Sequence, residues 1–250
     1  MKTQLAKQKI DGVVDLADHL LHDHFIFISA SEMRSHLKCS NEQIQKFIDE
    51  WEQLTLDRYM ADGGTYRYRR YGQFDKASSS DELVLLPHQA YEQSKEVNYL
   101  NGDIARWFEP LTSSFVDSEV LQRTLLFLAD LYDLTIGKPT DWNIRLHPYR
   151  IEATSQQLGQ PTPEGLHRDG VTFIASMMIQ RQNVTGGVTT LTDNLRRPIT
   201  TIELDNTFDI ILANDARTLH DVSSIRPVNQ HETASRDVLV IAFTKKGGPL

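Results

Sequence analysis

The second half of the chain, from Asp141 onward, is a succession of short apolar segments, and this pattern constrains the fold more than any other feature. The segments are rich in β-branched and aromatic residues, and short polar turns separate them. They are WNIRLHPYRIEAT, GVTFIASMMIQR, VTTLTD, TTIELD, FDIILAN and RDVLVIAF. Many short strands at such spacing are typical of an all-β sandwich or barrel. We therefore expect a β core in this half.

The first sixty residues have the periodicity of helices. Ile44, Phe47 and Trp51 recur at helical spacing, and Ser40 and Gln43 match the capping box that begins a helix. The upstream segment ISASEMRSHL predicts a shorter helix of the same kind. The pattern therefore predicts a helical N-terminal layer.

A further helix is predicted between the TYRYRRY segment and the β core. Its apolar residues share one helical face, Asp117 is expected to cap its start, and Gly137 is expected to end it.

The chain has 250 residues, which is enough to bury one sizeable core. We expect a single domain over residues 1–250 that is mainly β with helical support. A helical layer of residues 1–60 is predicted to pack on a double-stranded β-helix, or jelly roll, of residues 61–250. One inserted helix is expected near 117–136.

The charge and cysteine content exclude several classes of protein. The formal net charge is −8, whereas nucleic-acid binders and proteins that seek anionic membranes need a basic face. The single cysteine, Cys39, allows no intramolecular disulfide. No apolar run approaches the roughly 18 residues that span a bilayer, and the charged N-terminus lacks the apolar core of a signal peptide. We expect a cytoplasmic protein that binds neither nucleic acid nor membrane, and the sequence makes no prediction of its oligomeric state.

The segment PTPEGLHRDG, residues 161–170, holds the most informative motif. His167 and Asp169 form an H-x-D pair, and side chains two residues apart on an extended backbone point to the same face. His220 follows the segment FDIILAN, and Arg236 opens the last predicted strand. Two neutral imidazoles and one carboxylate on one face of a metal leave coordination positions open, which is the arrangement in non-haem Fe(II) oxygenases.

Arg236 fits this chemistry because of what 2-oxoglutarate requires. This cosubstrate can bind iron through its C1 carboxylate and keto oxygen, while O₂ takes the remaining position. Its far carboxylate then needs a bidentate, permanently charged partner, which an arginine provides. Spacing alone leaves alternatives open. The histidines could be hydrogen-bonded residues of a non-catalytic jelly-roll binding protein, or ligands in a zinc or manganese cupin that needs no 2-oxoglutarate.

Several of these motifs resemble a known family. PEGLHRDG, the downstream GG-x-T, the distal His220 and the blocks DGGTYRYRRY and QSKEVNYLNGDIARWFEPL are similar to the bacterial 2-oxoglutarate/Fe(II) dioxygenases typified by L-isoleucine 4-hydroxylase. The resemblance extends from about Trp51 to the C-terminus. It implies an enzyme that uses Fe(II), 2-oxoglutarate and O₂. Members of this family hydroxylate free aliphatic amino acids such as isoleucine, leucine or methionine, and some oxidise the thioether to a sulfoxide.

The resemblance also implies roles for individual residues. His167, Asp169 and His220 would be the iron ligands, and Arg236 would bind the far carboxylate of 2-oxoglutarate. One departure concerns that arginine, because many such enzymes have R-x-S where this chain has a valine in the third position. Either the missing hydroxyl comes from elsewhere, or the carboxylate is bound by another arginine, for which Arg226 is the candidate.

A site for a free amino acid needs a cation for the carboxylate, an acceptor for the ammonium group and an apolar wall. The candidates are Tyr66 and Arg70 in TYRYRRY, Tyr149 and Arg150 in LHPYRIEA, and Glu164 beside the H-x-D pair. Arg145 adds to this local basic charge, which in an acidic chain favours a small carboxylate over a polymer. The alternative substrate is a peptidyl or carrier-tethered residue.

The remaining histidines are not expected to be ligands. His88, His147 and His231 lack a partner at metal-ligand spacing and are predicted to be structural or surface groups. His19 and His22 lie one helical turn apart, but such pairs more often lie on a solvated helix face.

Overall fold

The computed structural model of the chain describes residues 2–93, 95 and 102–247, so part of the block QSKEVNYLNGDIARWFEPL lies outside the described residues. The helices are α1 (Lys2–Asp23), α2 (Ala30–Leu37), α3 (Asn41–Asp49), a 3₁₀ helix (Glu50–Gln53), α4 (Ser113–Val116) and α5 (Glu119–Ile136). The first strands are β1 (Phe25–Ile28), β2 (Thr55–Leu56), β3 (Arg67–Arg69), β4 (Gly72–Lys76), β5 (Leu83–Leu85), β6 (Trp142–Ala153) and β7 (Phe173–Gln182). The later strands are β8 (Val184–Gly186), β9 (Val188–Asp193), β10 (Pro198–Glu203), β11 (Ile210–Asn214), β12 (Thr218–Val222), β13 (Ile225–Pro227) and β14 (Ala234–Lys245).

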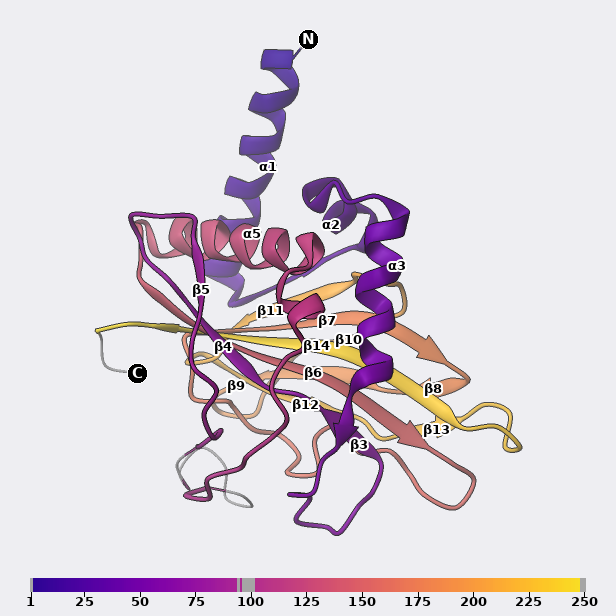
Figure 1. Cartoon of the computed structure of the whole chain (residues 1–250). Helices are drawn as coiled ribbons and strands as arrows, with labels where there is room; N and C mark the ends of the chain where they lie inside the picture. The colour runs from indigo at the N-terminus through magenta and orange to yellow at the C-terminus, as the bar shows by residue number, and fades with distance from the viewer. Residues whose placement is uncertain (1, 94, 96–101, 248–250) are drawn as a thin grey trace.

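A large antiparallel sheet forms the centre of the molecule (Figure 1). Its strand order is β1-β11-β7-β14-β6-β3-β2, and β4 and β5 continue it beside β6. The two longest strands pair along their whole length, from Ala234 opposite Ala153 to Lys245 opposite Trp142. Side chains alternate along a strand, so every second residue of β6 and β14 lies on one face of the sheet and the residues between them lie on the other.

A second, smaller layer covers one face of the large sheet. It consists of the sheet β10-β9-β12 and the pair β13-β8. Apolar residues of the two layers pack together, including Ile174, Ile211 and Val238 from the large sheet and Leu191 and Leu204 from the smaller layer. Neighbouring strands in both sheets are often far apart in the sequence, and two packed antiparallel sheets connected in this way form a jelly roll. The predicted mainly β fold with helical support is therefore confirmed.

The helices lie on the opposite face of the large sheet (Figure 1). Helix α5 packs against this face, and its Tyr132 stacks on Phe173 of β7 with ring centroids 4.3 Å apart. Helices α1, α2 and α3 pack in turn on α5. Residues Leu239, Ile241 and Phe243 of β14 point into this helical core, so the residues between them face the smaller layer.

The segment of residues 1–60 is not purely helical as predicted, because Phe25–Ile28 form β1. This strand pairs antiparallel with β11, from Phe25 opposite Ala213 to Ile28 opposite Ile210. The aromatic and β-branched residues of FIFI favour a strand, and β1 pairs with the edge of β11 that β7 leaves free.

The helix ends agree with the sequence at most positions. The capping box of Ser40 and Gln43 is present, and Gly137 ends α5 with a left-handed φ of 80°. Asp117 does not cap α5 as expected. It ends the short helix α4, and Ser118 is the N-cap of α5 without a side-chain hydrogen bond.

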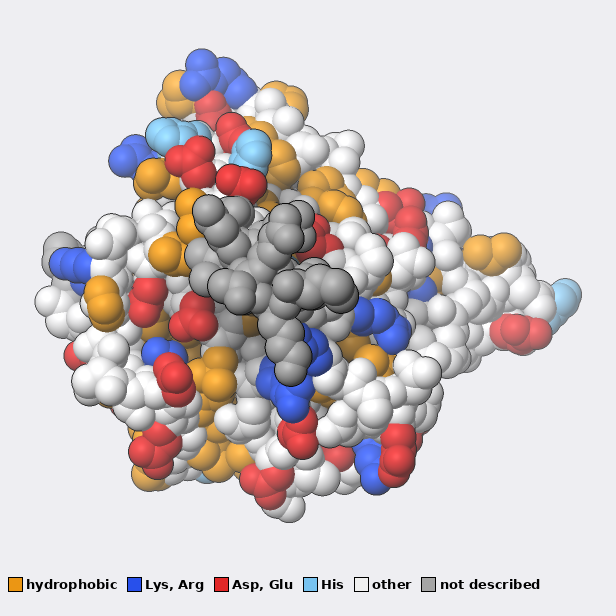
Figure 2. All heavy atoms as spheres, turned by 90° about the horizontal axis from the view of Figure 1, so that it is seen from above, with side chains coloured by type: hydrophobic (Ala, Val, Ile, Leu, Met, Phe, Trp, Pro, Cys, Tyr) orange, Lys and Arg blue, Asp and Glu red, His pale blue; other side chains and the backbone are white. Residues whose placement is uncertain are grey.

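The surface shows two further features. No helix within the described residues is long and apolar enough to cross a membrane. On the face drawn in Figure 2, basic side chains lie in small groups among acidic ones. The described residues of this face therefore form no continuous basic stripe of the kind that a bound polyanion requires.

Candidate metal centre and cosubstrate cavity

The predicted ligand residues meet at one point between the two layers. His167 lies in the connection from β6 to β7, and His220 lies on β12. Their backbones exchange two hydrogen bonds of 3.0 and 2.8 Å, which places the two imidazoles side by side. Asp169 follows two residues after His167. One ligand atom from each of these three residues lies within 4.8 Å of the other two, and we call this group the triad.

The surrounding backbone orients the triad. The Nδ1–H of His167 donates to the carbonyl of Gly165 at 2.8 Å, which leaves Nε2 free to bind a metal ion. The carboxylate of Asp215 accepts from the backbone N–H groups of Asp169 and Val171 at 3.0 and 2.9 Å. Such outer hydrogen bonds hold metal ligands in their productive orientation.

The electrostatics of the triad suit a divalent cation. Burial, followed by the nearby His167, lowers the pKa of His220 to about 3, so its imidazole is neutral at pH 7. Burial lowers the pKa of His167, but the carboxylates of Asp169 and Glu164 outweigh this effect and raise it. Burial also raises the pKa of Asp169. The two imidazoles and the carboxylate bind a cation when they are deprotonated. Two nitrogens and one carboxylate oxygen on one face of the metal match the ligands of non-haem Fe(II).

The triad opens into a cavity of about 1190 Å³, its mouth included. Alternate residues of the central strands line the floor of the cavity, because these residues face the smaller layer. They are Arg145, His147, Tyr149 and Ile151 of β6, Ile174 and Ser176 of β7, Ile211 and Ala213 of β11, and Arg236, Val238, Val240 and Ala242 of β14.

Arg236 is a buried cation without a partner in this cavity. Its side chain is 1% exposed, and its Nε and Nη2 atoms have no hydrogen-bond partner among the described residues. Burial, and then the neighbouring Arg181, lowers the pKa of Arg236 to about 10, so it is still charged at pH 7. An uncompensated buried guanidinium is costly, and a bidentate anion would satisfy it.

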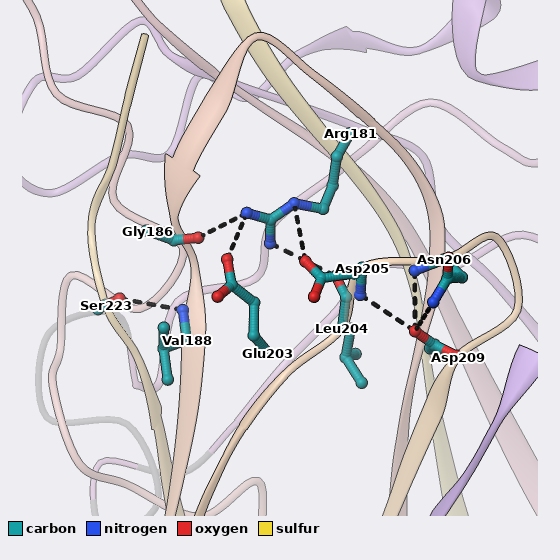
Figure 3. A network of polar contacts seen from close by, with 9 residues as sticks. All are labelled: Arg181, Gly186, Val188, Glu203, Leu204, Asp205, Asn206, Asp209 and Ser223. Atoms are coloured by element: carbon teal, nitrogen blue, oxygen red, sulfur yellow. Dashed lines mark hydrogen bonds and ion pairs between the residues drawn. The ribbon is translucent and has the colours of Figure 1, made fainter. Parts of the chain in front are cut away.

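The neighbouring Arg181 is fully engaged, in contrast to Arg236. Figure 3 shows its guanidinium between the carboxylate of Glu203 at 2.6 Å and the carbonyl of Gly186 at 3.0 Å, with Asp205 at 3.8 Å. Arg181 and Arg236 are directly opposed on β7 and β14. Of this pair, only Arg236 has guanidinium nitrogens free for a ligand.

A hydroxyl lies on the strand that passes Arg236. Gly187 has a φ of 75°, and a Cβ there would lie 2.9 Å from the Cδ of Arg236, so only glycine lets the arginine lie so close. Thr189 comes two residues later, on β9. Its buried Oγ1 has no hydrogen-bond partner among the described residues, and Thr189 lines the cavity. This is the one cavity-lining hydroxyl of the described residues that is both buried and unpartnered.

Four arginines form a cationic wall on the side of the cavity nearest β3 and β6. We call Arg67, Arg69, Arg106 and Arg145 the arginine wall. Arg67 pairs with the buried Asp57 at 2.8 Å. Arg106 donates to Gln93 at 2.8 Å, and Arg69 donates to Nδ1 of His147. The wall is therefore positively charged, and among the described residues Asp57 is the only buried carboxylate paired to it.

The structure brings some of the predicted substrate residues to the cavity and not others. Tyr149 and Glu164 line it, and Glu164 lies 3.7 Å from Nε2 of His167. Arg150 faces away, because it is one residue out of phase with Tyr149 on β6. Its guanidinium instead pairs with Asp237 and Glu52.

The remaining candidates also lie outside the cavity lining. Tyr66 is buried in a separate apolar cluster and donates to Asp62 at 2.5 Å. Arg70 donates to the backbone carbonyls of Gln53 and Pro110. Arg226, the alternative partner for 2-oxoglutarate, lies exposed on β13.

Sequence reasoning missed several residues of the cavity. His147 was predicted to be a structural or surface group, but it is buried in the cavity lining beside Arg69. Within TYRYRRY, Arg67 and Arg69 line the cavity, whereas the predicted Tyr66 and Arg70 do not. The alternation of TYRYRRY contained the signal, since Arg67 and Arg69 share a face and pair with Ile151 and Tyr149. The pair His19 and His22 does not meet: each contacts an aspartate of α1 on the exposed helix surface.

A jelly roll whose cavity holds two histidines, one aspartate and a buried arginine without a partner among the described residues defines a class of protein, the non-haem Fe(II) oxygenases that use 2-oxoglutarate. The family model described as 2OG-Fe dioxygenase matches residues 49–242. The chain therefore belongs to the 2OG-Fe dioxygenase family, and it is an enzyme that uses Fe(II), 2-oxoglutarate and O₂.

Similar proteins cover nearly the whole chain. The 3(1)-hydroxy-L-isoleucine 4-dioxygenase of Pantoea ananatis is 28% identical over 93% of this chain and 96% of its own. The L-isoleucine-4-hydroxylase of Bacillus thuringiensis is 28% identical over 86% of this chain and 92% of its own. Among solved structures, a bsmA homolog from Methylobium petroleophilum PM1 has a TM-score of 0.85 at 29% identity, with 95% and 96% of the two chains covered. IDO from Bacillus thuringiensis shares the fold, with a TM-score of 0.77 at 20% identity over 94% of this chain and 96% of its own.

Proposed function

We propose that this enzyme oxidises a free aliphatic L-amino acid such as leucine, isoleucine or methionine, by hydroxylation or by sulfoxidation of the thioether. One oxygen atom of O₂ enters the amino acid, and the other enters the succinate that forms as 2-oxoglutarate loses CO₂. The observation that carries this proposal is a triad that opens on one cavity with cations on two sides. Arg236 is available for one carboxylate and the arginine wall for another. The two isoleucine-related relatives support an amino acid as the substrate.

The triad would hold the iron in this proposal. Nε2 of His167, a carboxylate oxygen of Asp169 and an imidazole nitrogen of His220 are the ligand atoms. When bound, the iron supplies the O₂ chemistry that no side chain can perform. The chain contributes orientation, because Gly165 and Asp215 hold the ligands in place.

Arg236 and Thr189 would bind the far carboxylate of 2-oxoglutarate. The two free nitrogens of Arg236 offer a bidentate contact, and the Oγ1 of Thr189 replaces the hydroxyl that R-x-S would supply. The packing of Gly187 on the arginine stem supports this arrangement. Arg226 has no role in it, since it lies exposed on β13.

Glu164 and Tyr149 are the proposed substrate contacts among the residues predicted from sequence. Glu164 lies next to the triad and can accept a hydrogen bond from an ammonium group. Tyr149 presents an aromatic ring to the cavity, which suits an aliphatic tail.

The proposal is tested by succinate release. The Fe(II)-loaded enzyme is supplied with 2-oxoglutarate and a pool of the twenty amino acids, and the products are analysed by mass spectrometry. We expect the pool to stimulate succinate release and one amino acid to gain one oxygen atom. If the pool gives no stimulation and a peptidyl or carrier-tethered residue does, the substrate is a tethered residue and the proposal is wrong.

A further inference from the structure

Arg145 is the one uncommitted cation of the arginine wall. The other three wall arginines each contact a protein side chain, as described above. Arg145 has no hydrogen bond or ion pair to any described residue, and its Nε is buried. It nevertheless lines the cavity, from the inward face of β6. A guanidinium that faces a cavity with no protein partner is a ready site for a carboxylate.

The register of the large sheet places Arg145 at the triad end of the cavity. Arg145 is opposite Ala242 of β14, and Ala242 is opposite Ile174 of β7, close to the start of that strand. The triad residue Asp169 lies just upstream of β7. Asp169 and Arg145 both line the cavity.

Arg236 belongs to a different part of the cavity. It is six residues from Ala242 along β14, which corresponds to about 20 Å of extended strand. Arg145 and Arg236 are therefore placed for two different molecules. Arg236 is placed for the cosubstrate, and Arg145 for the molecule that is oxidised.

His147 adds a neutral donor beside Arg145. The two residues are separated by one position on β6 and so face the cavity together. Arg69 donates to Nδ1 of His147, so the ring proton lies on Nε2, which is a donor. Burial, and then the surrounding arginines, hold the pKa of His147 well below its usual value, so the ring adds no charge.

We propose that Arg145, assisted by the Nε2–H of His147, binds the α-carboxylate of the amino acid substrate. This inference rests on the proposed function and names the contact that makes the enzyme select free amino acids. The site would take a small molecule with a carboxylate next to the carbon chain that is oxidised.

The test compares an amino acid with its amide in three proteins. In the wild type, the kcat/KM for isoleucine, leucine or methionine should exceed that for the corresponding amide at least about tenfold, because the amide lacks the charged partner. Arg145→Gln should lower kcat/KM for the acid about 10- to 100-fold and leave the amide nearly unchanged, so the acid/amide ratio falls toward one. Arg150→Gln is the matched control on the same strand, facing away from the cavity, and should keep the wild-type ratio.

Two further measurements separate the outcomes. Arg145→Lys keeps a charge without the two-pronged geometry, so its ratio should be intermediate. The Kd of 2-oxoglutarate, measured without O₂, should be the same in all Arg145 variants. An Arg145 variant that keeps the full ratio, or one that loses 2-oxoglutarate affinity instead, overturns the proposal. If the wild type oxidises no free amino acid, the proposed function itself is wrong. If the wild type prefers the acid and Arg145→Gln keeps that full preference, only the role of Arg145 is wrong.

Discussion

Arg236→Lys should weaken the binding of 2-oxoglutarate about thirtyfold. The guanidinium is buried, two of its nitrogens lack a protein partner, and it carries its charge at pH 7 because its pKa is lowered only to about 10. Lysine keeps that charge but loses the second contact of a bidentate pair. Such a loss costs about 2 kcal/mol, which corresponds to the thirtyfold change in Kd.

The assay is isothermal titration of the Fe(II)-loaded protein without O₂. 2-Oxoglutarate is compared with 2-oxopentanoate, which keeps the keto acid end and lacks the far carboxylate. Arg236→Lys should weaken only 2-oxoglutarate. Arg226→Lys is the matched control, since Arg226 lies exposed on β13.

Two results would refute this reasoning. An equal loss for both compounds would show that Arg236 does not contact the far carboxylate. An unchanged Arg236→Lys together with a large loss in Arg226→Lys would move the carboxylate site to β13.

Three other perturbations have defined outcomes. Alanine at any one of the three triad positions should abolish Fe(II) binding and turnover while the far-UV circular dichroism stays that of the wild type; full activity in one variant removes that residue from the ligand set. Thr189→Val should raise the Kd of 2-oxoglutarate about fivefold, in line with the loss of about 1 kcal/mol for one hydrogen bond, whereas Thr190→Val on the same strand should not, and equal effects would make the loss a packing effect. Arg150→Met should lower the free energy of unfolding by about 3 kcal/mol at pH 8, because it leaves the buried Asp237 carboxylate unpaired. Burial already raises the pKa of Asp237, and the loss of Arg150 raises it further, so at lower pH the folded variant binds a proton that the unfolded chain does not. The loss of unfolding free energy should therefore shrink toward pH 5. A loss that is independent of pH, measured by urea denaturation, contradicts this.

The sequence by itself determined the strands of the core and singled out the three residues of the candidate metal centre. Alternating and β-branched segments specify strands because each strand needs only its own pattern to bury one face. The H-x-D motif is local, so its two ligands share a face in any extended backbone. His220 could be paired with them from its position after a predicted strand, and the family resemblance supported that pairing.

Only the tertiary structure decided which arginines meet the cavity. Arg145 and Arg150 are both basic residues of one strand, and a single step in the alternation sends one to the cavity and the other to Asp237. Which face is inward depends on the register between β6 and β14, a contact between segments about 90 residues apart. The position of the candidate hydroxyl has the same origin, because Thr189 and Arg236 line one cavity only when β9 folds over the large sheet. Local patterns determine which segments form strands, whereas long-range pairing determines which face of each strand lines the cavity.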